Sequence, residues 1–135
     1  LGAFPVDRKG NSAGSIKKSI KLLESGEVVG MFPQGHRFAG CELESTRDNV
    51  KGGAAMAVWH ATVPVLPMYI ETKNSRVRLF RPITIHIGKP ISYDSFGFEK
   101  GGSAEYEHGA KLIFDEIISI KNAGALPSGG EKSDG

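Results

Sequence analysis

Apolar and polar positions repeat along the chain with two different periods, and these periods predict its helices and strands. Near the start, three apolar residues recur at spacings of four and three, namely Ile16, Ile20 and Leu23. This is the period of a helix with one apolar face. Asn11 or Ser12 is a suitable N-cap for that helix, and Gly26 stands where a glycine often follows a helix end.

The same reasoning predicts two more helices. Residues 54–62 are mostly apolar, follow Gly52-Gly53 and stop before Pro64, which cannot continue a helix. A last helix is expected after Ser103, its candidate N-cap, because an apolar stripe follows: Tyr106, Ala110, Ile113, Phe114 and Ile117. Residues 122–135 are rich in Gly, Ser and charge. We therefore expect one domain over residues 1–121 and a disordered tail over residues 122–135.

Short apolar runs predict the strands. We expect the end of a short extended strand at residues 4–6, apolar buried strands near 28–32 and 65–70, and half-exposed strands at 76–81 and 83–87, where apolar and polar residues alternate. Residues 38–49 show no period and are expected to form a loop. The succession of helices and strands is typical of an α/β protein with a mixed, largely parallel sheet flanked by helices.

Composition narrows the possible functions. Apolar residues make up 39% of the chain and charged residues 24%, which is typical of a globular protein. The formal net charge of +2 does not call for a nucleic-acid partner. One cysteine, Cys41, excludes an internal disulfide, and the scattered histidines lack the spacing of a metal site, so we expect no metal or cofactor. His86 alternates with three isoleucines and should face solvent or a covering helix.

Cationic residues stand at the ends of the predicted elements. Arg8 and Arg37 follow the strands expected at 4–6 and 28–32, and Lys51 immediately precedes a helix start with its free N–H groups. Ligands of α/β sheets bind beyond the carboxyl ends of the strands. Each one alone is more consistent with a solvated surface charge, but their recurrence at the ends of elements favours an anion site formed by all three.

Three short blocks carry a resemblance to a known family. In chain order they are Gly2-Ala3-Phe4-Pro5-Val6-Asp7-Arg8, Phe32-Pro33-Gln34-Gly35-His36-Arg37 and Val63-Pro64-Val65-Leu66-Pro67-Met68. Their order resembles the glycerolipid acyltransferases, in particular the 1-acylglycerol-3-phosphate acyltransferases of phospholipid synthesis. Gly88-Lys89-Pro90-Ile91 is similar to a further segment of that family. The resemblance extends over residues 2–118.

The resemblance implies acyl transfer from a thioester, carried by coenzyme A or acyl-carrier protein, to a hydroxyl of lysophosphatidate. It places five residues at the substrate: Arg8, Gln34, Gly35, His36 and Arg37. The two arginines would hold the acceptor phosphate, while Lys51 is added here on electrostatic grounds. No cofactor is implied, and the expected location is the cytoplasmic face of a membrane, held peripherally or by an amino-terminal part.

Two departures from the family pattern matter. The family's general base lies in a His-x4-Asp block, but the four histidines here are followed five residues later by Cys41, Val65, Ile91 and Ile113. We therefore expect the chain to be a carboxyl-terminal fragment in which that block would precede Leu1, and we predict that the 135 residues alone are inactive.

The second departure is Gln34, which replaces the usual glutamate and puts the identity of the acceptor in doubt. An alternative function is a non-catalytic module of the same fold that binds phosphate or anionic lipid. Consumption of a thioester donor would separate the two.

Overall fold

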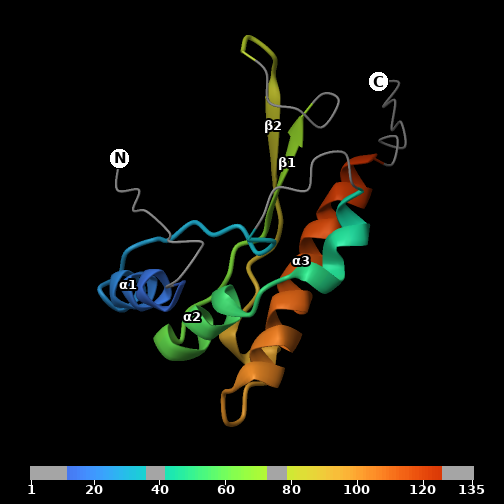
Figure 1. The fold of residues 1–135 in the computed structure, drawn as a ribbon. Helices are drawn as coiled ribbons and strands as arrows, with labels where there is room; N and C mark the ends of the chain where they lie inside the picture. The colour runs from blue at the N-terminus through green and yellow to red at the C-terminus, as the bar shows by residue number, and fades with distance from the viewer. Residues whose placement is uncertain (1–11, 36–41, 73–78, 126–135) are drawn as a thin grey trace, which may run out of the picture.

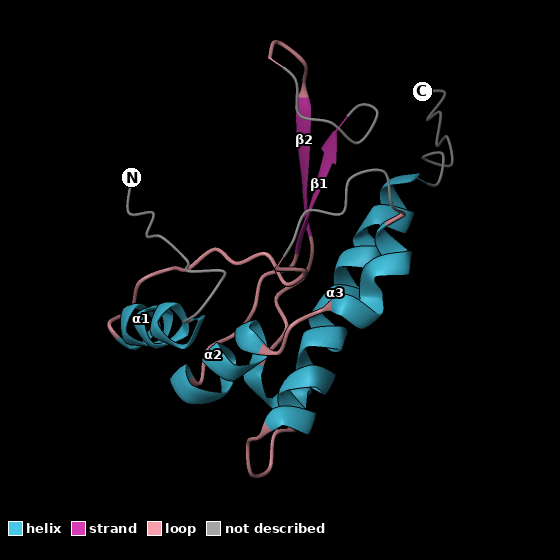
Figure 2. Ribbon diagram, viewed as in Figure 1, coloured by secondary structure: helices cyan, strands magenta, loops and turns pink. Residues whose placement is uncertain are grey.

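The structure is a computed structural model that describes residues 12–35, 42–72 and 79–125. In this part, α-helices are labelled α, 3-10 helices η and strands β. Their order is α1 (Ser12–Glu24), η1 (Leu43–Asn49), α2 (Gly53–Ala61), β1 (Met68–Thr72), β2 (Ile83–Ile87), η3 (Tyr93–Phe96) and α3 (Ser103–Ala125). Helix α3 runs the length of the helical part, α1 and α2 lie near one end, and the two strands extend away from them (Figures 1 and 2).

The first predicted helix is confirmed as α1. It ends as expected, because Gly26 adopts a φ of 86° and its N–H donates a 3.1 Å hydrogen bond to the carbonyl oxygen of Leu23. The apolar residue Ile16 meets the start of α2, where a β-carbon on Gly53 would lie 3.1 Å from Ile16 Cδ1. Ser12 is the first residue of the helix, whereas Asn11 lies outside the described residues.

Helices α2 and α3 form the core, as their apolar patterns predicted. They approach closely because small residues face each other: a β-carbon on Gly109 would lie only 3.0 Å from Cβ of Ala55. Phe114, with 1% of its surface exposed, packs in the same cluster as Val50. Helix α3 continues to Ala125, so residues 122–125 are helical, and the rest of the expected tail lies outside the described residues.

The expectation of a largely parallel sheet is wrong for the described residues. Strands β1 and β2 pair antiparallel, with Ile70 opposite Ile85, and an isolated antiparallel bridge joins Val65 to Ile91. A parallel pair needs a crossover of a dozen or more residues, usually a helix, and no helix lies between β1 and β2 among the described residues. The strand predicted at 83–87 is confirmed, whereas the one predicted at 65–70 begins only at Met68.

Three other local predictions change. The segment 28–32 is no strand among the described residues, and Val28 is 96% exposed rather than buried. Residues 43–49, expected in a loop, form η1. Leu79 and Phe80 lie in a turn instead of a strand, while residues 76–78 and the strand predicted at 4–6 lie outside the described residues. An extended segment becomes a strand only when another backbone pairs with it, which local apolarity does not specify.

The two faces of the β1–β2 sheet differ. One carries His86, whose ring lies against α3 at Gly124, so the predicted covering helix is confirmed. The other face carries apolar side chains that are 42–63% exposed, namely Met68, Ile70, Ile83, Ile85 and Ile87. Separately, none of the helices in the described ranges is both long and apolar enough to cross a membrane.

Candidate functional site

The block that contains Gln34 forms a tight turn. The N–H of Gly35 donates a 3.2 Å hydrogen bond to the carbonyl oxygen of Phe32, which closes a four-residue turn. Pro33 takes its second position, where the fixed φ of proline is favourable. Gly35 has a φ of 66°, a left-handed conformation that side-chain-bearing residues rarely adopt. Proline and glycine thus fix the backbone on both sides of Gln34.

The turn is joined to the residue that precedes α2. The N–H of Lys51 donates a 3.1 Å hydrogen bond to the carbonyl oxygen of Pro33. A β-carbon on Gly35 would lie 3.5 Å from Cγ of Lys51, so the lysine stem passes beside the glycine. The structure therefore brings together three of the predicted site residues: Gln34, Gly35 and Lys51.

The start of α2 adds a partial positive charge beside Lys51. The N-cap is Gly52, and no side chain in the described part caps the first N–H groups of the helix. A β-carbon on Gly52 would lie 3.0 Å from Cβ of Tyr106, so the glycine allows α2 to begin in contact with α3. Free N–H groups and an exposed ammonium group attract anions, including phosphate. This side of the molecule is electrostatically suited to a phosphorylated ligand.

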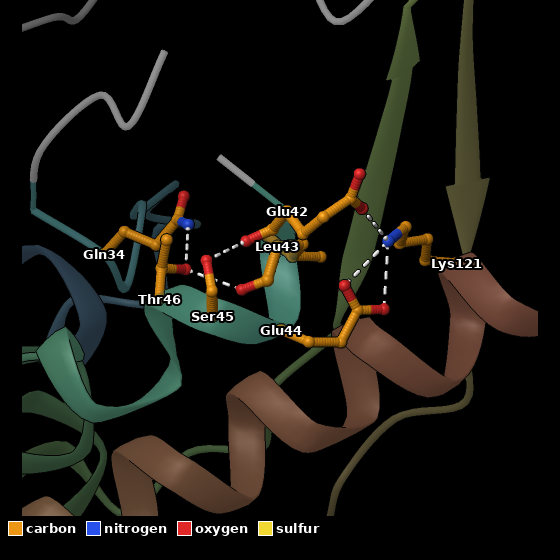
Figure 3. A network of polar contacts seen from close by, with 7 residues as sticks. All are labelled: Gln34, Glu42, Leu43, Glu44, Ser45, Thr46 and Lys121. Carbon is orange, nitrogen blue, oxygen red and sulfur yellow. Dashed lines mark hydrogen bonds and ion pairs between the residues drawn. The ribbon is translucent and has the colours of Figure 1, made fainter. Parts of the chain in front are cut away.

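The side chain of Gln34 is held by a residue that the sequence did not single out. Its Nε2 donates a 2.7 Å hydrogen bond to Oγ1 of Thr46, whose hydroxyl in turn donates a 2.7 Å bond to the carbonyl oxygen of Leu43 (Figure 3). Thr46 is only 2% exposed. It lies in η1, a segment without hydrophobic periodicity, so no local signal could have identified it.

Ion pairs attach η1 to α3. Nζ of Lys121 lies 2.8 Å from an Oε atom of Glu44 and 3.4 Å from Glu42 (Figure 3). The hydrogen bond from Lys121 lowers the pKa of Glu44, and the same contact raises the pKa of Lys121. These shifts favour the charged forms of both groups. The element that holds Gln34 is therefore itself fixed to the longest helix.

A second pair strengthens the same attachment. Arg47 donates two parallel hydrogen bonds to Asp115, from Nε at 2.6 Å and from Nη2 at 2.8 Å. This two-pronged geometry is the strongest form of an arginine–carboxylate pair. The hydrogen bond from Arg47 lowers the pKa of Asp115. Lys111 and Asp48 add a longer contact of 3.8 Å between the same two elements.

Three predicted site residues, Arg8, His36 and Arg37, lie outside the described residues, so their placement stays a prediction. Surface hollows in the described part lie elsewhere. One of about 90 Å³ is lined by residues that include His86 and Lys121, and one of about 290 Å³ by residues that include Arg47 and Asp115. Neither is lined by the Gln34 turn or by Lys51.

Comparison with known proteins decides the family. The model of the acyltransferase family matches residues 1–71, which is more than half of the chain and includes the Gln34 turn and Lys51. The chain belongs to the acyltransferase family. The resemblance inferred from the three sequence blocks is thereby confirmed.

Curated relatives carry a more specific name. The chain is 36% identical over 100 residues to a 1-acyl-sn-glycerol-3-phosphate acyltransferase of Bacillus subtilis (strain 168); the match covers 71% of this chain and 46% of that protein. It is 40% identical over 97 residues to a protein of the same name from Streptococcus pneumoniae (strain ATCC BAA-255 / R6), covering 67% of this chain and 32% of that protein. The chain thus spans less than half the length of either relative. No solved structure gives a significant match.

Proposed function

We propose that the protein transfers an acyl chain from a thioester donor to a hydroxyl of lysophosphatidate, in phospholipid biosynthesis. Two relatives named 1-acyl-sn-glycerol-3-phosphate acyltransferase support the acceptor, and membership of the acyltransferase family supports the reaction class. The donor is coenzyme A or acyl-carrier protein charged with the acyl chain, and no bound cofactor takes part. The protein acts at the cytoplasmic face of a membrane, where an amphiphilic acceptor is available.

The observation that carries this proposal is the meeting of the Gln34 turn with Lys51 at the start of α2. The turn comes from one family block and Lys51 lies outside that block, yet a 3.1 Å backbone hydrogen bond joins them. The exposed ammonium group of Lys51 and the positive end of α2 attract the acceptor phosphate. Arg8 and Arg37 would add guanidinium groups suited to two-pronged phosphate binding.

The reaction needs a base as well as a phosphate site. The base takes the proton of the acceptor hydroxyl, the oxygen attacks the thioester carbonyl, the carbon–sulfur bond breaks, and the thiol leaves with a proton. Within the 135 residues, no histidine is followed five residues later by aspartate. We therefore propose that the 135 residues bind the acceptor but do not catalyse transfer by themselves, and that the base comes from polypeptide beyond them.

The test is acyl transfer by the protein expressed from its full coding sequence, with acyl-coenzyme A or acyl-carrier protein as donor and lysophosphatidate or glycerol 3-phosphate as acceptor. Phosphatidate formed from lysophosphatidate supports the proposal. Lys51→Met should raise KM for the acceptor about tenfold, the equivalent of one lost charged hydrogen bond. Lys100→Met, a change at an exposed lysine in the turn before α3, is the matched control and should leave KM unchanged.

Arg37→Ala tests the second cation in the same assay. It should raise KM for the acceptor at least as much as Lys51→Met, because a guanidinium can make two parallel bonds to phosphate. If donor turnover survives Arg37→Ala unchanged, the assignment of Arg37 to the acceptor phosphate is wrong. Binding of lysophosphatidate without consumption of any donor would instead favour a non-catalytic lipid-binding module.

A further inference from the structure

The side chain of Gln34 is held in one orientation by the hydroxyl of Thr46, which accepts a hydrogen bond from it. The hydroxyl of Thr46 has one proton, which is donated to the carbonyl oxygen of Leu43 at 2.7 Å. Toward Gln34 the Thr46 oxygen therefore acts as a hydrogen-bond acceptor, and Nε2 of Gln34 lies 2.7 Å from Oγ1. An amide can donate there, whereas an ionised carboxylate would bring oxygen against oxygen. The contact thus accounts physically for glutamine at a position where the family usually has glutamate.

The bond to Thr46 also decides which side of the amide is free. With Nε2 bound to Thr46, the carbonyl oxygen Oε1 of Gln34 points away from η1 (Figure 3). The backbone around Gln34 is already fixed by the bonds Gly35 to Phe32 and Lys51 to Pro33. The remaining freedom is rotation of the side chain, and Thr46 removes it.

Thr46 can hold this orientation because its own place is fixed. It is 2% exposed, and its neighbour Leu43 packs against the core cluster that includes Phe114. The ion pairs of Glu44 with Lys121 and of Arg47 with Asp115 join η1 to α3 on either side of Thr46 in sequence. A rigid helix therefore supports the side chain of Thr46, to which Gln34 is hydrogen-bonded.

We propose that Thr46 is a positioning residue for the acceptor: it fixes the Gln34 amide as a donor to η1, so that Oε1 accepts a hydrogen bond from the one free hydroxyl of lysophosphatidate as it binds, before the base takes that proton. This inference rests on the proposed function. Thr46 itself touches no substrate and acts only through Gln34. Its loss should therefore weaken acceptor binding and leave donor binding intact.

The experiment uses the protein expressed from its full coding sequence, with lysophosphatidate and acyl-coenzyme A as probes. Thr46→Val keeps the shape of the side chain and removes the hydroxyl; it should raise KM for lysophosphatidate about five- to tenfold, the effect of one hydrogen bond, with KM for the donor unchanged. Thr46→Ser keeps the hydroxyl and should restore the wild-type value. Ser45→Ala is the matched control, since that exposed hydroxyl of η1 donates to the carbonyl oxygen of Glu42 at 2.7 Å and has no contact with Gln34 among the described residues.

A double-mutant comparison separates positioning from a merely structural role. In a Gln34→Ala background, Thr46→Val should raise KM no further, because the residue through which it acts is gone. An equal rise in both backgrounds, or a lower melting temperature with unchanged KM, overturns the inference. Gln34→Glu should raise KM for lysophosphatidate. Adding Thr46→Val to it should lower that KM part of the way back, because it removes the lone pairs that face the carboxylate.

A second readout is independent of activity. In the ¹⁵N NMR spectrum, the side-chain amide signal of Gln34 should shift and exchange faster with solvent in Thr46→Val, and it should not do so in Ser45→Ala. An unshifted signal overturns the inference even if the enzyme is active. If the wild-type protein transfers no acyl chain, the proposed function fails and the acceptor role of Oε1 fails with it, while a shifted signal still shows that Thr46 orients the amide.

Discussion

The backbone N–H of Lys51 donates a hydrogen bond of 3.1 Å to the carbonyl oxygen of Pro33. This bond joins the Gln34 turn and the start of α2 into one unit. Among the described residues, the other hydrogen bond that ties the turn to a distant segment is the one from the side chain of Gln34 to Thr46. Because Gly52 contacts Tyr106 of α3, the same unit is supported by the core. A phosphate bound beside Lys51 would therefore meet a preorganised surface.

Gly35→Ala tests the geometry of that turn. The φ of 66° should cost ~1 to 2 kcal/mol once a β-carbon is present, while the 3.5 Å approach to Lys51 Cγ is an ordinary contact and adds little. Gly97→Ala is a matched control, because Gly97 has a φ of 64° and open space around it. Urea unfolding should show similar losses of stability for both variants, whereas only Gly35→Ala should weaken acceptor binding. Equal acceptor binding in the two variants would contradict the placement of the site.

Gly109→Ala tests the close crossing of α2 and α3. Alanine favours a helix by roughly 0.5 to 1 kcal/mol over glycine. Here the new β-carbon would lie 3.0 Å from Cβ of Ala55 and 3.3 Å from ring atoms of Phe96 and Phe98, and overpacking costs ~1 to 3 kcal/mol. We expect a net loss of stability in urea unfolding.

Gly124→Ala in the same helix provides the comparison. Its β-carbon would meet the ring of His86 at 3.3 Å, a part-exposed side chain whose Nε2 lies 2.6 Å from Oε2 of Glu71, so a shift of the ring by a few tenths of an ångström relieves the contact. The helix preference of alanine should then prevail, and stability should stay level or rise. A Gly109→Ala variant as stable as Gly124→Ala would show that the helices separate more easily than the geometry indicates.

Acid should weaken the attachment of η1 to α3. The pKa of Asp115 is lowered by its hydrogen bond from Arg47, so the pair contributes stability above the ordinary carboxylate pKa of about 4 and loses it as pH falls below that value. Asp115→Asn should therefore flatten the fall of the melting temperature below about pH 4. The effect should be small, since the Arg47 and Asp115 side chains are 42% and 48% exposed. It should shrink further in about 1 M salt, where charges are screened over about 3 Å. An effect that salt does not diminish would point to another cause.

The apolar face of the β1–β2 sheet should bind hydrophobic dyes. It carries Ile85 and Ile87, which are 56% and 63% exposed, and contiguous apolar surface of this kind mediates association. We expect the 135-residue chain to enhance anilinonaphthalene sulfonate fluorescence, and the double change Ile85→Thr, Ile87→Thr to reduce it. Thr84→Ser, on the opposite face, is the control and should change nothing. If the double change leaves the dye fluorescence unaltered, the dye binds elsewhere on the chain.

Local sequence determined the three α-helices. The periodic apolar residues that predicted α1 and α3 need only the helix's own geometry to select a buried face, so Ile113 and Phe114 could be identified as core residues in advance. The positive φ of Gly35 was not predicted: glycine tolerates this conformation, but the turn that requires it is seen only in the structure. The family blocks also identified the acyltransferase family, because they depend on residue types in order and not on contacts.

Tertiary structure decided everything that depends on a distant partner. Whether strands run parallel or antiparallel depends on how β1 and β2 pair. An apolar run predicts a strand but not the strand with which it pairs. Arg47 and Asp115 are 68 residues apart, and their pairing helps to turn a segment without period into η1. Thr46 acquires its contact with Gln34 only once η1 is held there. Short-range patterns record which face of an element is buried, whereas the identity of the group it meets is set when the chain folds.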